Sequence, residues 1–116
     1  MAIATVVQRN SLCSKYIADN LFAALFTADP GGTGTVVGEV TGGTYARVSI
    51  AWGAVSAGSV TGTATLNVPT GTTITFAGSC TSGVATTSDL RDKNGITSQT
   101  FSTAGTYALT ITFSET

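Results

Sequence analysis

Residues 107–114 read YALTITFS, with a large apolar side chain at every second position. Tyr107, Leu109, Ile111 and Phe113 therefore share one face of an extended chain, and alanine, threonine and serine occupy the other face. An apolar side chain at every second residue is typical of a β-strand with one face in a core and one face in water. The segment predicts the last strand of a β-rich fold.

The same alternation recurs upstream, in residues 45–52, 60–68 and 72–80. Segments rich in glycine, with one proline, separate these runs and supply turns. Short strands joined in this way predict a mainly β fold, an antiparallel β-sandwich of the jelly-roll or immunoglobulin-like kind. The expected core residues are Leu21, Leu25, Ile50, Trp52, Leu66, Ile74, Phe76, Leu109, Ile111 and Phe113.

One segment near the N-terminus follows a different period. Between residues 14 and 26, apolar side chains recur at spacings of three and four, which predicts an α-helix. Asn10 or Ser11 could cap its N-terminus, and the Asp-Pro-Gly-Gly run at residues 29–32 would end it. The width of its apolar face indicates that this helix is packed against a sheet or a neighbouring subunit.

The 116 residues are expected to form a single domain, with an N-terminal segment and helix at 1–30, a glycine- and threonine-rich loop at 31–43 and the sandwich at 44–116. The loop has few charges and many main-chain groups with no evident local partner. Such groups can be satisfied by a neighbouring subunit through strand addition, so the loop, together with the strand edges, is the expected interface. Its candidate interface residues are Gly31, Gly32, Thr33, Gly34, Thr35, Val36, Val37 and Glu39.

The composition argues against catalysis. The chain has no histidine and only 9% charged residues, whereas acid–base chemistry near neutral pH usually relies on histidine or clustered carboxylates. Residues 89–95 hold the one cluster of charge and are interpreted as a solvated hairpin loop with Asn94-Gly95 at its turn; a weak cation site or a partner-contacting loop are alternatives. No enzyme activity, no cofactor and no metal are therefore expected.

Several partner classes are also disfavoured. The five basic residues are scattered and the net charge is −1, which does not suit nucleic acid, and no apolar run is long enough to span a membrane. Cys13 and Cys80 are interpreted as buried thiols, with a bridge between them as the alternative. The aromatic residues Tyr45, Trp52, Tyr107 and Phe113 are expected in the core, and a sugar-binding platform of exposed aromatics is the alternative.

Four stretches carry a family resemblance. They are FAALFTADPG at residues 22–31, GEVTGGTYAR at 38–47, SQTF at 98–101 and GTYALTI at 105–111. Together they resemble small β-rich virion proteins of tailed phages, which are especially common in phages of actinobacteria. The resemblance implies a structural protein of the virion, made in the host cytoplasm.

The resemblance leaves the position in the virion open. The middle of the chain, residues 78–96, lacks a stretch common in tail-associated members, and the short chain encodes no stalk. We therefore expect a capsid decoration protein that stabilises the head by binding the major capsid protein, itself or both, as a homo-oligomer with a trimer expected by analogy. The alternative is a minor tail or tail-fibre component that contacts tail proteins and takes part in host attachment, and a carbohydrate-binding module is a lesser alternative.

Overall fold

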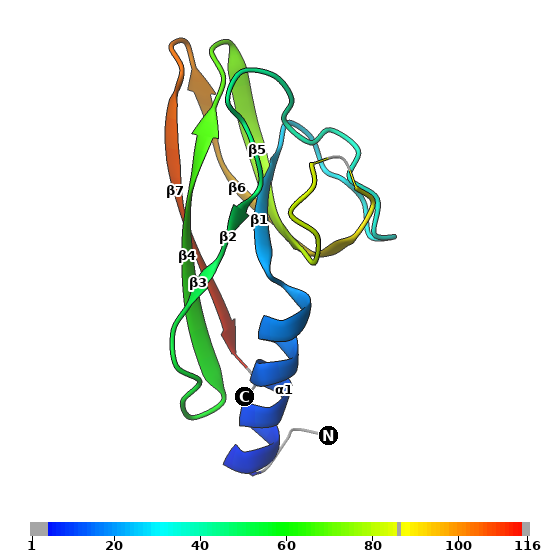
Figure 1. The fold of residues 1–116 in the computed structure, drawn as a ribbon, viewed down its shortest axis with the longest axis vertical. Helices are drawn as coiled ribbons and strands as arrows, with labels where there is room; N and C mark the ends of the chain where they lie inside the picture. The colour runs from blue at the N-terminus through cyan, green and yellow to red at the C-terminus, as the bar shows by residue number, and fades with distance from the viewer. Residues whose placement is uncertain (1–4, 86, 115–116) are drawn as a thin grey trace.

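The computed structural model describes residues 5–85 and 87–114 and shows two antiparallel sheets facing each other (Figure 1). This confirms the predicted antiparallel sandwich with one helix. The first sheet has the order β2-β1-β5-β6, and its strands are β2 (Val48–Ser49), β1 (Phe22–Phe26), β5 (Thr72–Cys80) and β6 (Leu90–Phe101). The second sheet has the order β3-β4-β7, with β3 (Ala51–Trp52), β4 (Ser59–Val68) and β7 (Gly105–Ser114).

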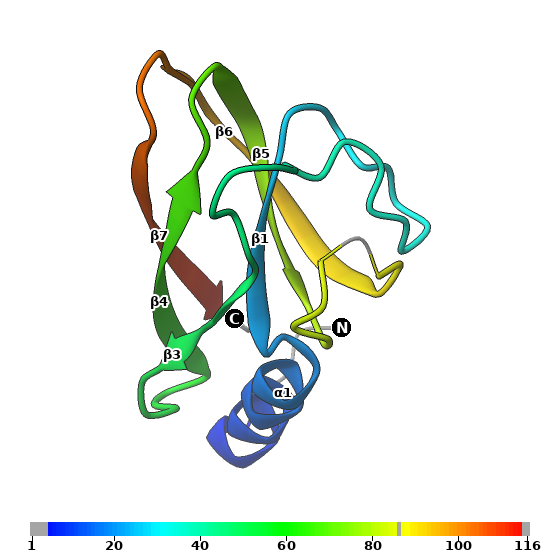
Figure 2. The same ribbon diagram turned by 45° about the horizontal axis from the view of Figure 1, so that its top comes forward.

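The chain changes sheet three times. Ile50 separates β2 from β3, and short turns after β4 and after β6 carry the chain from one layer to the other (Figure 2). The predicted strand at residues 45–52 is therefore two short strands, one in each sheet. One side of the sandwich is closed by this crossing strand, and the opposite side lies between the edge strands β6 and β7.

The helix is the main error of the sequence-based prediction. Helix α1 spans Val6–Asp19, and residues 22–26 form strand β1 instead of its last turns. The helix is capped by Thr5, whose hydroxyl accepts a hydrogen bond from the Gln8 amide, so Asn10 and Ser11 lie inside the helix. Strand β1 reads FAALF, and its last four residues are buried. A strand covered on both faces loses its alternation, and a run of apolar residues then looks like a helix face.

Helix α1 continues the layer of the first sheet beyond the start of β1 and covers the inner face of the second sheet (Figure 1). Its Tyr16 ring stacks on Phe113 with ring centres 4.1 Å apart and meets Trp52 edge-on at 5.8 Å. The buried Asn20 joins helix to strand: its carbonyl accepts from the Trp52 indole, and its side chain bonds Tyr16 and Ser79. The helix is thus packed as predicted, and Tyr16, one of the apolar residues that suggested it, makes its aromatic contacts.

The two faces of the first sheet hold separate apolar clusters. The main core lies between the sheets and includes Leu25, Leu66 and Ile74. The second cluster lies on the other face of the first sheet; it comprises Ala24, Phe26, Cys80 and Leu90, with Val36 and Phe76 packed against it. A β-bulge between Ile74 and Phe76 places these two side chains in different clusters, whereas strict alternation would have put them together.

The expected core residues differ in their burial. Leu25, Ile50, Leu66, Ile74 and Leu109 are buried, whereas Trp52, Phe76, Ile111 and Phe113 are half-buried. Leu21 is 39% exposed, so its assignment to the core was wrong; it lies in the turn between α1 and β1.

Both cysteines are buried thiols that take no part in a disulfide. Within the described residues, no helix combines the length and apolarity that a membrane span requires.

Candidate functional site

The expected interface loop is bound to its own subunit. The Gly34 carbonyl accepts from the Leu90 amide at 3.1 Å, the Gly38 carbonyl accepts from Thr27 at 2.8 Å, and the Val40 amide donates to Leu25 at 3.0 Å. Val36 packs against the second apolar cluster and helps to cover it. The expectation that these main-chain groups lack local partners was therefore wrong.

The other candidate residues of this loop vary in exposure. Gly32, Thr33 and Val37 are exposed, whereas Gly31 and Thr35 are partly covered. The Thr35 hydroxyl donates to the Pro30 carbonyl, and the Gly31 amide donates to Asp29. The loop is therefore partly committed to its own subunit, while Gly32, Thr33, Val37 and residues 41–43 remain exposed.

Glu39 does not face a partner. Its carboxylate takes two hydrogen bonds from Arg47, from Nε at 3.0 Å and from Nη2 at 2.9 Å, and both side chains are at most 1% exposed. Arg47 also bonds the Asp89 carboxylate at 2.8 Å and two main-chain carbonyls, those of Ser82 and Thr87. All five guanidinium donors are thus used.

This buried cluster joins three parts of the chain. Glu39 belongs to the long loop, Arg47 precedes β2, and Asp89 precedes β6. Burial alone lowers the pKa of Arg47, but its hydrogen bonds to Glu39 and Asp89 outweigh burial and raise that pKa. Burial also raises the pKa of Tyr45, whose hydroxyl donates to Glu39 and accepts from the Leu25 amide. The cluster joins these segments, because Arg47 pairs with both carboxylates and it and Glu39 are shielded from water.

The predicted hairpin loop at residues 89–95 is mostly a strand. Residues 90–95 belong to β6, and Gly95 pairs with Phe76 of β5 in the middle of the sheet. The interpretation of Asn94-Gly95 as a turn was therefore wrong. Asp89 pairs with Arg47, Asp92 accepts from Tyr16, and Lys93 pairs with Asp29. No cluster of metal-ligating side chains occurs among residues 5–85 and 87–114.

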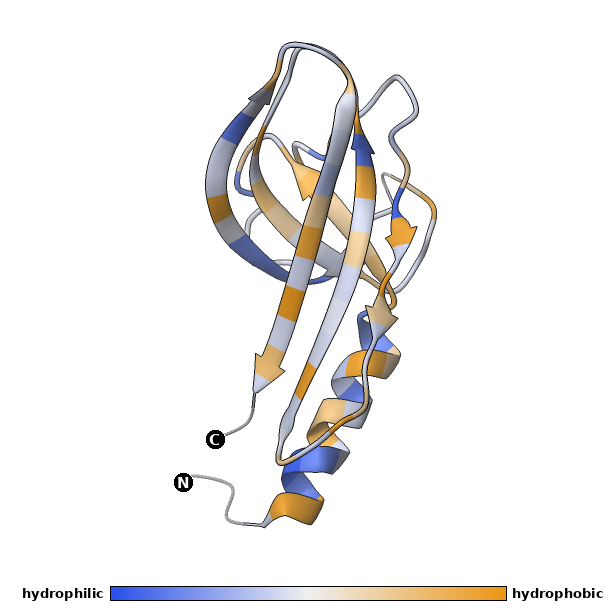
Figure 3. Cartoon of the chain, turned by 90° about the vertical axis from the view of Figure 1, so that its left-hand side faces the viewer, coloured by the Kyte–Doolittle hydropathy of each residue, from blue (hydrophilic) through white to orange (hydrophobic). Residues whose placement is uncertain are grey.

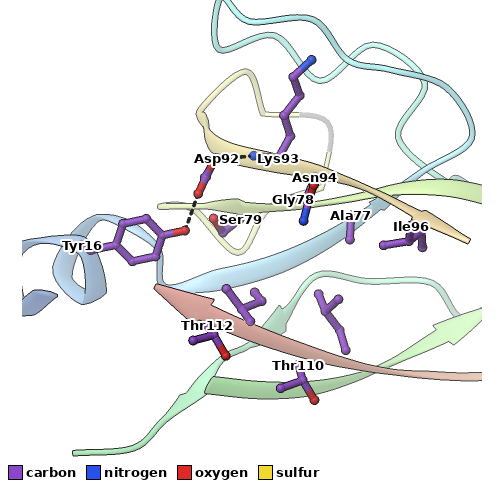
Figure 4. A pocket seen from close by; sticks show the side chains of 12 residues that line it. Tyr16, Ala77, Gly78, Ser79, Asp92, Lys93, Asn94, Ile96, Thr110 and Thr112 are labelled. Carbon is purple, nitrogen blue, oxygen red and sulfur yellow. Dashed lines mark hydrogen bonds between the residues drawn. The ribbon is translucent and has the colours of Figure 1, made fainter. Parts of the chain in front are cut away.

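A cleft of about 200 Å³ lies on the side of the sandwich between β6 and β7 (Figure 4). Ala77, Ile96, Leu109 and Ile111 supply its apolar lining, and its polar lining includes Asp92 and Asn94. The Tyr16 hydroxyl donates to Asp92 at 2.5 Å; burial, and then this hydrogen bond, raise the pKa of Tyr16, so it stays a neutral donor. Lys93 points away from the cleft (Figure 4). The cleft thus combines apolar side chains with a tyrosine–carboxylate hydrogen bond.

Among the described residues of strands β4 and β7, none that faces outward from the second sheet is charged. Strands β4 and β7 are paired along their whole length, from Ser59 opposite Ser114 to Val68 opposite Gly105. Figure 3 shows apolar and polar bands alternating along both strands. The outward positions, which we call the hydroxyl face, are Ser59, Thr61, Thr63, Thr65 and Asn67 on β4 and Thr106, Ala108, Thr110, Thr112 and Ser114 on β7.

The expected aromatic residues do not form an exposed platform. Trp52 and Tyr107 pack against the main core, and Phe113 stacks on Tyr16. Tyr45 bonds the buried Glu39. The hydroxyl face was not singled out from the sequence, although the alternating threonines of residues 106–112 lie on it. Strand edges were expected to take part in the interface, but the sequence did not indicate which edge.

Comparison with known families decides the class of the protein. Residues 14–112 match the sequence model of a family described as Podophage GP4 fiber I protein gp80. The chain belongs to this family. No curated protein and no solved structure gives a significant match. The protein is therefore a structural component of a bacteriophage virion, as the resemblance of residues 22–47 and 98–111 implied.

The region that matches the gp80 family contains the buried cluster of Glu39, Arg47 and Asp89. It also contains all strands from β1 to β6 and most of β7. The stretch GEVTGGTYAR, which carried much of the resemblance, contains both Glu39 and Arg47, and the fold pairs these two side chains. The description of the family refers to a podophage fibre and does not mention a capsid.

Proposed function

We propose that this protein is a component of a tail fibre, where it acts as a structural and binding module. The observation that carries the proposal is the match of residues 14–112 to a family described as a fibre protein. It favours the tail-fibre alternative over the capsid decoration that we expected from the chain length and from residues 78–96. The proposed partners are further copies of the chain and other tail proteins.

The surface of the molecule supports a binding role without catalysis. Arg47 forms ion pairs with Glu39 and Asp89 that hold loop segments together. The hydroxyl face presents ten outward side chains, none of which is charged. Threonine methyl and hydroxyl groups can be buried in an interface at lower cost than lysine or glutamate, since an unpaired buried charge is expensive. A face of this kind suits a protein that packs against other subunits.

Localisation in the intact particle tests the proposal. A small epitope fused to a phage-encoded copy would be detected by gold-labelled antibody fragments and, in parallel, by cryo-electron microscopy of the whole virion. Label confined to the tail or to fibres attached to it is the expected result. Label spread over the capsid shell would instead establish the decoration protein that we first expected.

A competition experiment addresses host attachment. Purified protein added to host cells before infection should slow adsorption if this fibre component itself contacts the cell. The matched control is the protein heated beyond its unfolding transition and cooled. Unchanged adsorption with folded protein, together with label on the fibre, would limit the role to building the fibre.

A further inference from the structure

The two edge strands on the open side of the sandwich, β6 and β7, differ in how well they are protected against pairing with another chain. Strand β6 carries Arg91, Asp92 and Lys93 directly after its first residue, and its pairing with β5 is interrupted by two register shifts. Charges and bulges are the devices by which proteins prevent an edge strand from pairing with another chain. Strand β7, at the edge of the second sheet, has none of them: it is uncharged, lacks proline and keeps one register with β4 over ten residues.

Strand β7 also presents hydrogen-bonding groups at its open edge. In an antiparallel ladder every second residue points its N–H and C=O toward the same neighbour, so half of the main-chain groups of β7 point away from β4. The strand is rich in threonine and in aromatic and branched side chains, which favour pairing. Its edge is therefore able to receive a further strand.

The sequence of β7 is complementary to itself in one antiparallel register. With Thr110 opposite its own copy, Leu109 lies opposite Ile111 and Tyr107 lies opposite Phe113. The remaining outward pairs are Ala108 with Thr112 and Thr106 with Ser114. Aliphatic residues then meet aliphatic ones, aromatic residues meet aromatic ones, and the outward positions meet one another, which are the pairs that stabilise antiparallel sheets.

Other registers lose this match. A shift by one residue would place Leu109 opposite Thr110, so that apolar side chains meet hydroxyls. A shift by two residues toward the start of the strand would place Gly105 opposite Phe113 and remove the aromatic pair. A charged or unrelated partner strand lacks this complementarity, whereas a second copy pairs every residue from Thr106 to Ser114.

We propose that β7 is a homodimer interface, in which two copies pair their β7 strands antiparallel about a two-fold axis at Thr110. The two second sheets would join into one sheet of order β3-β4-β7-β7-β4-β3, and the hydroxyl faces would form one continuous surface. Leu109 and Ile111, which line the cleft of Figure 4, would lie near the centre of the pairing. This two-fold arrangement replaces the trimer expected by analogy, and it does not depend on where in the virion the protein is placed.

A pair of lysine substitutions tests whether the β7 edge is the dimer interface. Thr110 and Thr63 are register partners on the hydroxyl face, and both are exposed, so either can become lysine without filling the core. Thr110→Lys would set two like charges against each other at the two-fold axis, whereas Thr63→Lys lies one strand further from it. In sedimentation velocity over a range of concentrations, wild type and Thr63→Lys should be dimers and Thr110→Lys a monomer with unchanged circular dichroism.

A pair of cysteine substitutions tests the register. Thr110→Cys places two thiols directly opposite each other, close to the separation that a disulfide needs. Ala108→Cys places them four residues apart along the strand, about 13 Å, which is too far. The native Cys13 and Cys80 are buried and should not react in the folded protein.

On a non-reducing gel after mild oxidation, Thr110→Cys should run as a covalent dimer and Ala108→Cys as a monomer. A wild-type protein that stays monomeric at every concentration would overturn the proposal. So would equal cross-linking of the two cysteine variants, or a trimer that survives the Thr110→Lys substitution.

Discussion

Arg47 and Glu39 form a two-point ion pair in which both side chains are shielded from water: Nε lies 3.0 Å from Oε2 and Nη2 lies 2.9 Å from Oε1. The pair connects the long loop after β1 to the segment that enters β2. Because Asp89 also bonds Arg47, the same guanidinium fixes the loop that leads into β6. These contacts hold the loop segments that cover the outer face of the first sheet.

Breaking this pair should destabilise the fold strongly. Glu39→Gln or Arg47→Met is expected to lower the free energy of unfolding by about 3–5 kcal/mol, because each leaves a buried charge without its main partner. Arg47→Lys should not restore stability, since an ammonium group cannot make the two-point contact. Chemical unfolding followed by circular dichroism measures the effect.

The exposed Arg91, which bonds the Thr81 hydroxyl, supplies the control: Arg91→Met should change stability by less than about 0.5 kcal/mol. The double variant Glu39→Leu with Arg47→Met should lose less than the sum of its single variants. Additive losses would show that the two residues do not act as a pair.

Gly62 of β4 is expected to tolerate no larger side chain. A Cβ atom there would come within 2.6 Å of both Ile50 and the Trp52 ring, so Gly62→Ala should cost about 1–3 kcal/mol through overpacking. Gly95 in β6 is the matched control, because a Cβ there meets Phe76 at an ordinary 3.7 Å. Gly95→Ala should be neutral or slightly stabilising in thermal melts. Equal melting temperatures for the two variants would contradict the packing of Trp52 over β4.

Leu25 and Leu21 should respond differently to the same truncation. Leu25 is fully buried in β1, and Leu25→Ala is expected to cost about 2–5 kcal/mol. Leu21 is 39% exposed, and Leu21→Ala should cost less than about 1 kcal/mol. If residues 14–26 formed one helix with both leucines in its apolar face, the two losses would be similar. Denaturant unfolding of the two variants distinguishes the arrangements.

The buried thiol of Cys80 should make stability depend on alkaline pH. Burial raises its pKa from the ordinary value of 9.0 to about 12, so the folded state keeps a proton that the unfolded state releases. This contribution is fully present below about pH 9 and is lost as the pH rises toward about 12. Urea unfolding from pH 8 to pH 11 should therefore show falling stability.

The Cys80→Ala variant should lose stability less steeply over the same pH range. A slope identical to that of wild type would assign the effect to other groups, such as the half-buried Tyr45. Alkylation of the wild-type protein at pH 8 should modify the two thiols only after denaturation, because both are buried.

Residues 38–47, which carry much of the family resemblance, include two members of the buried cluster, Glu39 and Arg47. The stretch GEVTGGTYAR could be recognised in the sequence, but nothing in it showed that Glu39 faces inward. An isolated glutamate in a glycine-rich loop is normally solvated, so it was placed with the interface residues. Only the fold turns Glu39 and Arg47, eight residues apart, inward to face each other, and brings Asp89 to Arg47 from 42 residues away.

The sequence by itself determined the strands that have one face in the core and one in water. Strands β4 and β7 follow strict alternation, and the limits of β5 were predicted correctly, because the period of two is a local property of an extended chain. Tertiary structure alone decided the state of residues 22–26. Their apolar side chains are compatible with a helix or with a strand buried on both faces, and only the packing of loops and sheets around them selects the strand.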